Sequence, residues 1–193
     1  MKKPYDKNKI GKFIGWGGEH LVFAYGDSQV IKFSLHVFIS GKSAVDKIIE
    51  DYHIGKKYFD SYILDTAILP YKNGRRCAEI QSKITCRFLT KKDLNRTLIK
   101  KQFDDIMERY QRMNKELKIT FDLFGREGLL HPFKNKAMSN ILVTPEAKLV
   151  LIDFSIMKLK KVKLREIPIW LLIEWARRRQ EKLLNHFINY NPN

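Results

Sequence analysis

The stretch NILVTPEAKLVLID (Asn140–Asp153) decides how the rest of the chain is interpreted. Two short apolar runs, Ile141–Val143 and Leu149–Ile152, flank a polar segment that contains a proline, and this pattern predicts a β-hairpin. An amide stands just before the first strand and a carboxylate just after the second. Antiparallel pairing would bring Asn140 and Asp153 to one end of the ribbon, where two oxygen ligands could share a hard cation. A core hairpin with polar ends is the plainer alternative.

A glycine-rich segment lies near the N-terminus, between predicted strands at residues 11–14 and 21–25. It contains Gly15, Gly17 and Gly18. Glycines let the backbone approach a ligand closely and turn its amides toward phosphate oxygens. A plain hairpin turn accounts for the same glycines, so this segment alone does not establish a binding site.

A lysine inside the next predicted strand strengthens the ligand interpretation. Lys32 lies in the apolar strand at residues 29–33, where its ammonium must reach water or a partner. The following segment, residues 43–62, has the apolar period of a helix. Glu50 or Asp51 of this helix could point inward and meet Lys32, and a solvated acidic face is the equal alternative for either one.

The remaining segments predict further strands and helices in alternation with turns. The expected elements are strands at 67–70 and 77–84 around an Asn-Gly turn, a connector at 85–89, helices at 91–120 and 168–190, and an irregular segment at 121–136.

Length and composition indicate a globular protein. A chain of 193 residues with 44% hydrophobic and 30% charged residues suits one domain, or two small lobes that share a cleft. The net charge of +16 indicates affinity for an acidic partner such as nucleic acid, anionic lipid, a phosphorylated sugar or nucleotide phosphates. A lysine-rich surface that reflects genomic composition explains the same charge equally well.

The sequence predicts a cytoplasmic location. No apolar run reaches the roughly 18–20 residues that span a bilayer, and no apolar segment follows the first lysines, so we expect neither a transmembrane segment nor a signal peptide. Cys77 and Cys86 are the only cysteines and have no metal-binding pattern around them, which suits a reducing compartment.

The order of these motifs resembles that of the protein-kinase-like superfamily, over about residues 11–160. The stretch GWGGEHLV at 15–22 resembles the G-x-G-x-x-G-x-V loop, with His20 in place of the third glycine. VIK at 30–32 resembles the V-A-I-K strand, and DFS at 153–155 resembles D-F-G with serine for the last glycine.

The separation of Asn140 from Asp153 is similar to that between the catalytic-loop Asn and the D-F-G Asp of the family. Segments at 51–59, 65–66 and 80–81 also resemble small bacterial kinase-like proteins. The resemblance implies an α+β, two-lobed fold, with a small antiparallel-sheet N-lobe at residues 1–86 and a reduced, mainly helical C-lobe at 87–193.

The resemblance also implies roles in binding ATP and Mg²⁺. Lys32 would hold the α- and β-phosphates, oriented by an ion pair with Glu50 or Asp51, and Asn140 and Asp153 would bind Mg²⁺ that bridges the phosphates. The loop residues Gly15, Gly17 and Gly18 would cover the phosphates, and adenine would lie at the hinge near Gln81 and residues 82–86.

One departure from the family concerns the residue that accepts the proton of the substrate hydroxyl. Where the family has an Asp before the catalytic-loop Asn, this chain has Asn135. An amide can position a hydroxyl but has no useful basicity, so the expected catalytic set of Lys32, Asn135 and Asp153 lacks a general base. Asp122 or His131 could be brought in from the preceding segment.

The sequence therefore favours an enzyme, an atypical kinase that transfers phosphate from ATP to an anionic or non-protein acceptor. Only a short segment follows Arg165, which disfavours a platform for protein substrates. The first alternative is a pseudokinase, a nucleotide-binding interaction module without transfer activity, which Asn135 favours. The second is a basic nucleic-acid-binding protein, which would bind with a steep dependence on salt.

Overall fold

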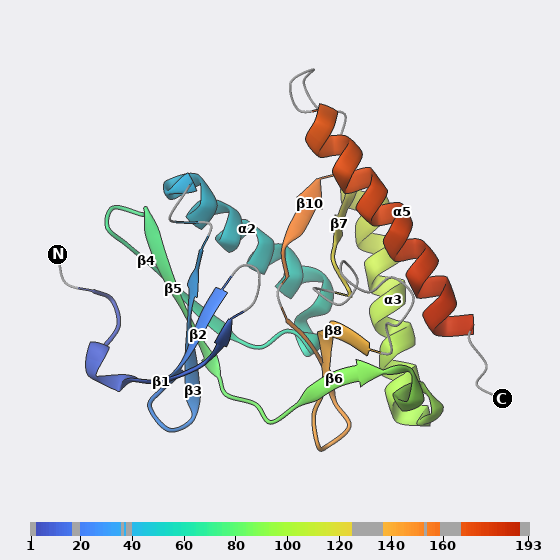
Figure 1. Cartoon of the computed structure of the whole chain (residues 1–193), viewed down its shortest axis with the longest axis horizontal. Coiled ribbons are helices and arrows are strands. Elements are labelled where there is room, and N and C mark those ends of the chain that lie inside the picture. The colour runs from blue at the N-terminus through green and yellow to red at the C-terminus, as the bar shows by residue number, and fades with distance from the viewer. Residues whose placement is uncertain are drawn as a thin grey trace. The chain divides into compact units, whose positions relative to one another are not determined.

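The structure is a computed structural model that describes residues 3–16, 20–35, 37, 40–124, 137–152, 154–158 and 167–189. Helices and antiparallel strands are mixed along the chain (Figure 1). The chain divides into two compact units, Met1–Thr85 and Cys86–Asn193. The assignment of these units to the lobes of a kinase-like fold stays a prediction.

The first unit is built on a five-stranded antiparallel sheet with the strand order β1-β2-β3-β5-β4. Its elements are η1 (Lys7–Lys9), β1 (Ile10–Trp16), β2 (His20–Tyr25), β3 (Gln29–Ser34), α2 (Lys42–Phe59), η2 (Asp60–Tyr62), β4 (Thr66–Tyr71) and β5 (Arg76–Ser82). The predicted Asn-Gly turn is confirmed: Asn73 and Gly74 adopt φ of 57° and 75°, which an Asn-Gly pair tolerates.

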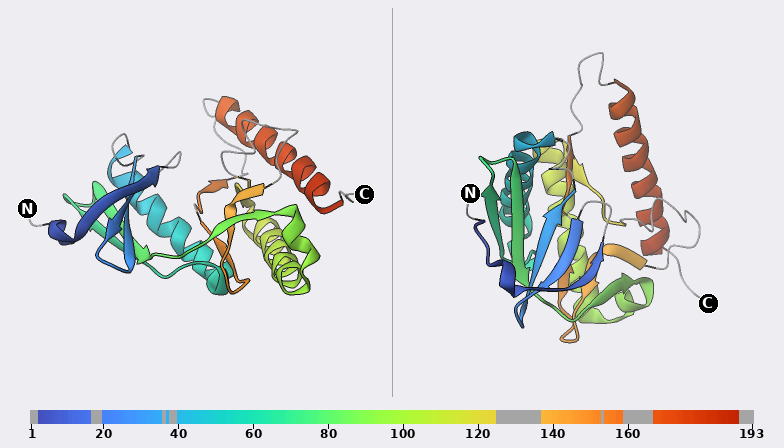
Figure 2. Two further views of the ribbon diagram at one scale, coloured as in Figure 1. Left: turned by 60° about the horizontal axis from the view of Figure 1, so that its bottom comes forward. Right: turned by 60° about the vertical axis from the view of Figure 1, so that its left-hand side comes forward.

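Strand alternation gives this sheet two apolar faces. One face contributes Ile31 and Ala78 to a core that also contains Tyr5 and Tyr25. Cys77 lies on the other face, where it packs against apolar residues of α2. Figure 2 shows α2 along this sheet. The residues packed there are Val37, Ala44, Val45, Ile48, Ile49 and Ile68.

The helix α2 begins one residue before the segment at 43–62 that the sequence predicted as helical. The helix begins at Lys42, with Gly41 at the N-cap position in a backbone conformation of φ 57°. The hydroxyl of Ser43 donates a hydrogen bond to the Ser40 carbonyl oxygen at 2.9 Å. Glycine permits the left-handed φ at this entry, whereas Ser43 already lies within the first turn.

The second unit contains two small antiparallel sheets, of order β6-β8-β9 and β10-β7, and two long helices. Its elements are β6 (Arg87–Thr90), η3 (Lys91–Asn95), α3 (Thr97–Leu117), β7 (Ile119–Phe121), β8 (Ala137–Val143), β9 (Leu149–Leu151), β10 (Ile156–Lys158) and α5 (Ile167–Asn189). Among the helices that the structure describes, none is long and apolar enough to cross a membrane.

Two predicted elements of this unit are wrong in detail. The expected connector at 85–89 is largely the strand β6, whose Leu89 is fully buried. The expected helix at 91–120 is divided into η3 and α3, because the Asp93 carboxylate accepts hydrogen bonds from the Thr90 backbone and hydroxyl and Arg96 has an extended backbone.

The predicted hairpin at 140–153 is confirmed as β8 and β9, with Ile141 opposite Leu151. An amide side chain of α3 holds its turn: Gln102 Nε2 donates to the Ala147 carbonyl oxygen at 2.8 Å, and Gln102 Oε1 accepts from the Leu149 N–H at 3.0 Å. Since one side chain satisfies both a backbone acceptor and a backbone donor, the hairpin is fastened to α3 without burying a charge.

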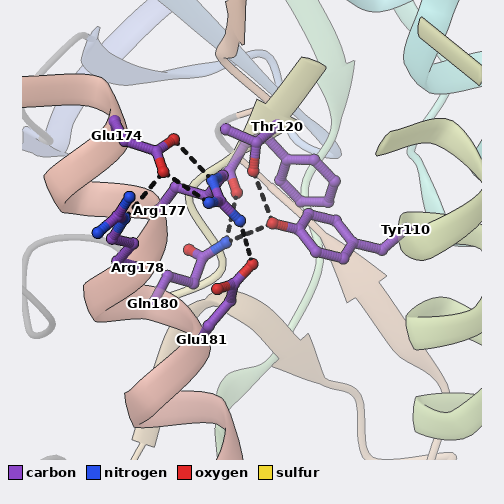
Figure 3. A network of polar contacts seen from close by, with 8 residues as sticks. Tyr110, Thr120, Glu174, Arg177, Arg178, Gln180 and Glu181 are labelled. Carbon is purple, nitrogen blue, oxygen red and sulfur yellow. Dashed lines mark hydrogen bonds and ion pairs between the residues drawn. The ribbon is translucent and has the colours of Figure 1, made fainter. Parts of the chain in front are cut away.

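A second amide fastens α5 to the rest of the unit (Figure 3). Gln180 Nε2 donates to the Tyr110 hydroxyl at 2.8 Å and to the Phe121 carbonyl oxygen at 3.0 Å, and Gln180 Oε1 accepts from the Leu123 N–H at 2.8 Å. The Tyr110 hydroxyl is also bonded to the Thr120 hydroxyl at 2.6 Å. Every polar atom of the buried Gln180 amide therefore has a backbone or side-chain partner.

The ion pairs beside Gln180 are more exposed. Glu174 pairs with Arg177 at 2.7 Å and with Arg178 at 2.9 Å, and the hydrogen bonds from Arg177 and Arg178, against the opposing effect of burial, lower the pKa of Glu174 to about 2. Arg177 also pairs with Glu181. Exposed ion pairs contribute little to the stability of a protein, with a median of about 0–1 kcal/mol.

Replacing Gln180 with Leu should destabilise the protein strongly, because the Leu123 N–H and the Phe121 carbonyl lose a buried partner. Each unsatisfied group costs about 1–3 kcal/mol, so we expect a loss of roughly 2–4 kcal/mol in the free energy of unfolding, measured in urea. The control is Arg178→Ala on the same helix, with an expected loss below about 1 kcal/mol. Equal losses for the two variants would contradict this role of Gln180.

Candidate functional site

Lys32 lies in the middle of the first unit's sheet, in β3 between β2 and β5. The register places Val22 of β2 and Glu79 of β5 directly opposite Lys32. Directly opposed residues share one face of the sheet, and Cys77, two residues from Glu79, packs under α2. Lys32 and Glu79 therefore lie on the face that α2 covers.

Glu79 is held by a second residue, His20 at the start of β2. His20 Nε2 lies 3.1 Å from Glu79 Oε1, and the two side chains are 13% and 12% exposed. A carboxylate oxygen only accepts, so Nε2 carries the proton and donates. Burial works to raise the pKa of Glu79, but the hydrogen bond and charge of His20 and the charge of Lys32 outweigh it and hold that pKa below its usual range.

Gly15 belongs to the same row of the sheet. It lies opposite Val22, so the row runs from Gly15 on β1 through Val22 and Lys32 to Glu79 on β5. A Cβ at Gly15 would meet no atom of the described chain within 4 Å, so packing does not require glycine there. The absence of a side chain leaves the backbone open to a ligand on this face.

The other predicted residues of the first unit are placed as follows. Gln81 lies on β5 opposite Val30 and Thr66, two residues from Glu79 and on the same face. Asp51 is buried on α2 and forms an ion pair with Lys47, and Glu50 is exposed on the same helix. The orientation of Lys32 by Glu50 or Asp51 stays a prediction. Gly17 and Gly18 lie outside the described residues.

In the second unit, Asn140 lies in β8 at the open end of the hairpin. The Ile152 N–H donates to the Asn140 carbonyl oxygen at 3.0 Å, so the residue before Asp153 is bonded to Asn140. Asn140 Nδ2 donates to the Asp122 carbonyl oxygen at 2.8 Å, which fixes the orientation of the buried amide. The remaining amide atom, Oδ1, is a hard oxygen of the kind that Mg²⁺ prefers.

Asp153 and Asn135 lie outside the described residues, as does His131, so their predicted roles stay predictions. Within the described ranges no group of three or more His, Cys, Asp and Glu side chains gathers to hold a metal ion. Mg²⁺ is commonly bound by one or two protein oxygens together with substrate phosphates, and a site formed by Asn140 and Asp153 would belong to that kind.

The fold also brings Asp122 beside Asn140, through the hydrogen bond from Asn140 Nδ2 to the Asp122 carbonyl. The segment after β7 is fastened along β8: Asp122 Oδ1 accepts from the Phe124 N–H at 2.9 Å, and the Ser139 hydroxyl donates to the Phe124 carbonyl oxygen at 2.6 Å. Sequence spacing from Asn140 selected Asn135, whereas the structure brings the backbone of Asp122 to Asn140 and bonds the Asp122 carboxylate to the Phe124 N–H.

Comparisons with known proteins give a distant likeness to kinase domains. No protein-family model matches the chain, and no curated protein matches it. Two crystal structures of the PknI kinase domain of Mycobacterium tuberculosis are similar to it, each with 13% sequence identity, a TM-score of 0.43 and coverage of 83% of this chain. The chain covers 62% and 64% of the length of these two domains. A likeness at this TM-score assigns neither fold family nor activity.

Replacing Asn140 with Asp should destabilise the protein in a pH-dependent manner. The new carboxylate keeps the shape of the amide but faces the Asp122 carbonyl oxygen without a proton to donate. We expect a loss of about 1–3 kcal/mol in the free energy of unfolding at pH 7.

This loss should shrink as the pH falls toward 4. The folded-state pKa of the new carboxyl is raised above that of the unfolded chain, so the folded variant binds more protons there and gains stability on acidification. Urea unfolding at several pH values, with wild type subtracted, measures the effect. A loss that does not change with pH would contradict the hydrogen bond to Asp122.

Proposed function

We propose that this chain binds ATP together with Mg²⁺ and transfers its terminal phosphoryl group to an anionic or non-protein acceptor. The observation that carries the proposal is the row formed by Gly15, Val22, Lys32 and Glu79 across four strands. This row places Lys32 on the same face of the sheet as Gly15, whose backbone is not covered by a side chain. A basic group beside accessible backbone amides is suited to nucleotide phosphates.

In this proposal the first unit binds the nucleotide. The Lys32 ammonium neutralises the α- and β-phosphates, and the amides around Gly15, Gly17 and Gly18 cover the phosphate oxygens. Gln81 lies on β5 near the segment that we expect to contact adenine, and its amide could hydrogen-bond the base or a ribose hydroxyl.

The second unit supplies the ligands for the metal. Asn140 Oδ1 and the Asp153 carboxylate would hold Mg²⁺, which when bound neutralises the charge that develops on the phosphates. The bond from the Ile152 N–H to the Asn140 carbonyl supports this pairing, because it brings the chain just before Asp153 to Asn140. Asn140 keeps Oδ1 available for the cation because its Nδ2 is bonded to Asp122.

Asp122 is our candidate for the general base in place of Asn135. The acceptor hydroxyl oxygen forms a bond to the terminal phosphorus, the bond from that phosphorus to the ADP oxygen breaks, and the hydroxyl proton passes to the Asp122 carboxylate. Asn135 would position the hydroxyl through its amide. The net charge of +16 favours an acceptor that is itself anionic.

The alternative is a pseudokinase that binds nucleotide and transfers nothing, which Asn135 favours. A basic protein that binds nucleic acid without a nucleotide site is the third candidate, and the net charge is the observation in its favour. The three candidates differ in whether they predict nucleotide binding and whether they predict turnover.

Thermal unfolding with and without Mg²⁺ and ATP tests nucleotide binding. A ligand that binds only the folded state stabilises it by about 2.7 kcal/mol at a concentration of 100 times Kd, which is a rise of several degrees in Tm. We expect this rise for wild type, its loss in Asp153→Ala, and its retention in the control Asp104→Ala, an exposed aspartate of α3. No rise at millimolar nucleotide would contradict both the kinase and the pseudokinase.

Replacing Asp122 with Asn tests turnover separately from binding. The variant keeps its backbone carbonyl, so the bond from Asn140 should persist and the Tm rise with Mg²⁺ and ATP should remain. We expect slow hydrolysis of ATP by the wild type, measured as released phosphate, to fall by about 10²–10⁴-fold, the usual contribution of a general base. Nucleotide binding without hydrolysis in the wild type would favour the pseudokinase. Unchanged hydrolysis in the variant would exclude Asp122 as the base.

A further inference from the structure

We propose that Glu79 of β5, rather than a carboxylate of helix α2, is the residue that positions Lys32. Glu79 stands directly opposite Lys32 in the antiparallel pair of β3 and β5. The inference rests on the proposed function, since it concerns how the phosphate-binding lysine is held.

The backbone geometry fixes this pair. Four consecutive residue pairs join β3 to β5, from Gln29 with Ser82 to Lys32 with Glu79, without a bulge between them. Opposed residues of an antiparallel pair have Cβ atoms about 4.5–5.5 Å apart, within reach of both of these long side chains. The two Cβ atoms therefore stay opposed as long as the β3–β5 pairing is intact.

Burial makes the pairing necessary. The Glu79 side chain is 12% exposed, and a carboxylate taken from water to this extent is costly unless opposite charge and hydrogen bonds compensate it. His20 supplies one hydrogen bond and Lys32 supplies charge, and together they keep the pKa of Glu79 below its usual range although burial opposes this. Glu79 is thus an anion that the fold retains beside Lys32.

The carboxylates of α2 are placed differently. The Asp51 side chain forms an ion pair with Lys47, one turn away on the same helix, and Glu50 is on the exposed side. The helix contacts the sheet through apolar residues, among them Val45 and Ile48. The packing of α2 on the sheet that these residues show is apolar.

This arrangement also explains why the glycine loop departs from its pattern at His20. A glycine at that position could not bond to Glu79, whereas the imidazole Nε2 lies 3.1 Å from its Oε1 and holds the carboxylate in place next to Lys32. Where a lysine's partner lies on a mobile helix, movement of that helix can switch the site. Here the partner lies on a neighbouring strand, so Lys32 is positioned whatever the state of α2.

The test uses two measurements on the full chain, with variants Lys32→Met, Glu79→Gln and the double variant. Glu50→Gln and Asp51→Asn serve as matched controls on α2. Without nucleotide, the urea midpoints form a double-mutant cycle, which isolates the coupling between Lys32 and Glu79. We expect the double variant to lose less stability than the two single variants together, because each single change leaves the other charge without its partner. Additive losses would overturn the pairing.

With Mg²⁺ and ATP, the dissociation constant is measured for the same variants. We expect Glu79→Gln to weaken binding about tenfold, the effect typical of removing a group that orients a ligand-binding side chain, and to have no further effect in Lys32→Met. If Glu79 had only a structural role, Glu79→Gln would weaken nucleotide binding equally in wild type and in Lys32→Met. Loss of binding in Glu50→Gln or Asp51→Asn, with Glu79→Gln unaffected, would overturn the inference.

The two measurements separate the inference from the proposed function. If wild type binds no nucleotide, the proposed function fails, and the nucleotide-free cycle still decides whether Lys32 and Glu79 form a pair. If Glu79→Gln does not fold, Glu79→Asp replaces it in both measurements. This variant keeps the charge but draws it back by one methylene, so it should retain part of the coupling.

Discussion

The burial of charge on one face of the N-terminal sheet is the constraint on which the rest of the first unit depends. Lys32, Glu79 and His20 lie on a face that α2 covers with apolar residues. Charges in such a place are tolerated only when their geometry is well fixed, because the desolvation penalty of each ion is several kcal/mol. The β3–β5 register fixes it, and a slip by one residue would turn Lys32 and Glu79 to the other apolar face.

In the second unit, neutral side chains rather than charged ones make the polar contacts between distant segments. Three side-chain amides join segments that are distant in sequence: Gln102 holds the turn of the β8–β9 hairpin, Asn140 holds the segment after β7, and Gln180 holds α5. An amide offers a donor and an acceptor, so it can satisfy backbone groups of either kind without burying a charge. The position of Asn140 is therefore a consequence of its own hydrogen bonds and does not depend on a bound ion.

Local patterns in the sequence were sufficient for much of the fold. The hairpin at 140–153, the strands around the glycine-rich segment and the long C-terminal helix each have a clear period or turn signal, and the structure has all of them. The strands β7 and β10 were not predicted, because three residues are too few to show an alternation and their pairing joins distant segments.

The candidate site was predictable only in part, for the same reason. Lys32 could be recognised in the sequence as a lysine inside an apolar strand, and Asn140 as an amide next to one. Glu79 did not, since its meeting with Lys32 depends on the pairing of β3 with β5, two strands that are not consecutive in the chain. The contact of Asn140 with Asp122 likewise spans 18 positions and follows from tertiary structure alone.

The central claim is that Lys32 binds the phosphates of a nucleotide. An ATP derivative whose terminal phosphate carries a reactive acyl group acylates lysines that lie beside the bound phosphates, and mass spectrometry then identifies the modified residue. The many other lysines of the chain serve as internal controls. We predict preferential acylation of Lys32, suppressed by excess ATP with Mg²⁺. Acylation spread over surface lysines, with Lys32 no more reactive than they are and no protection by ATP, would contradict the claim.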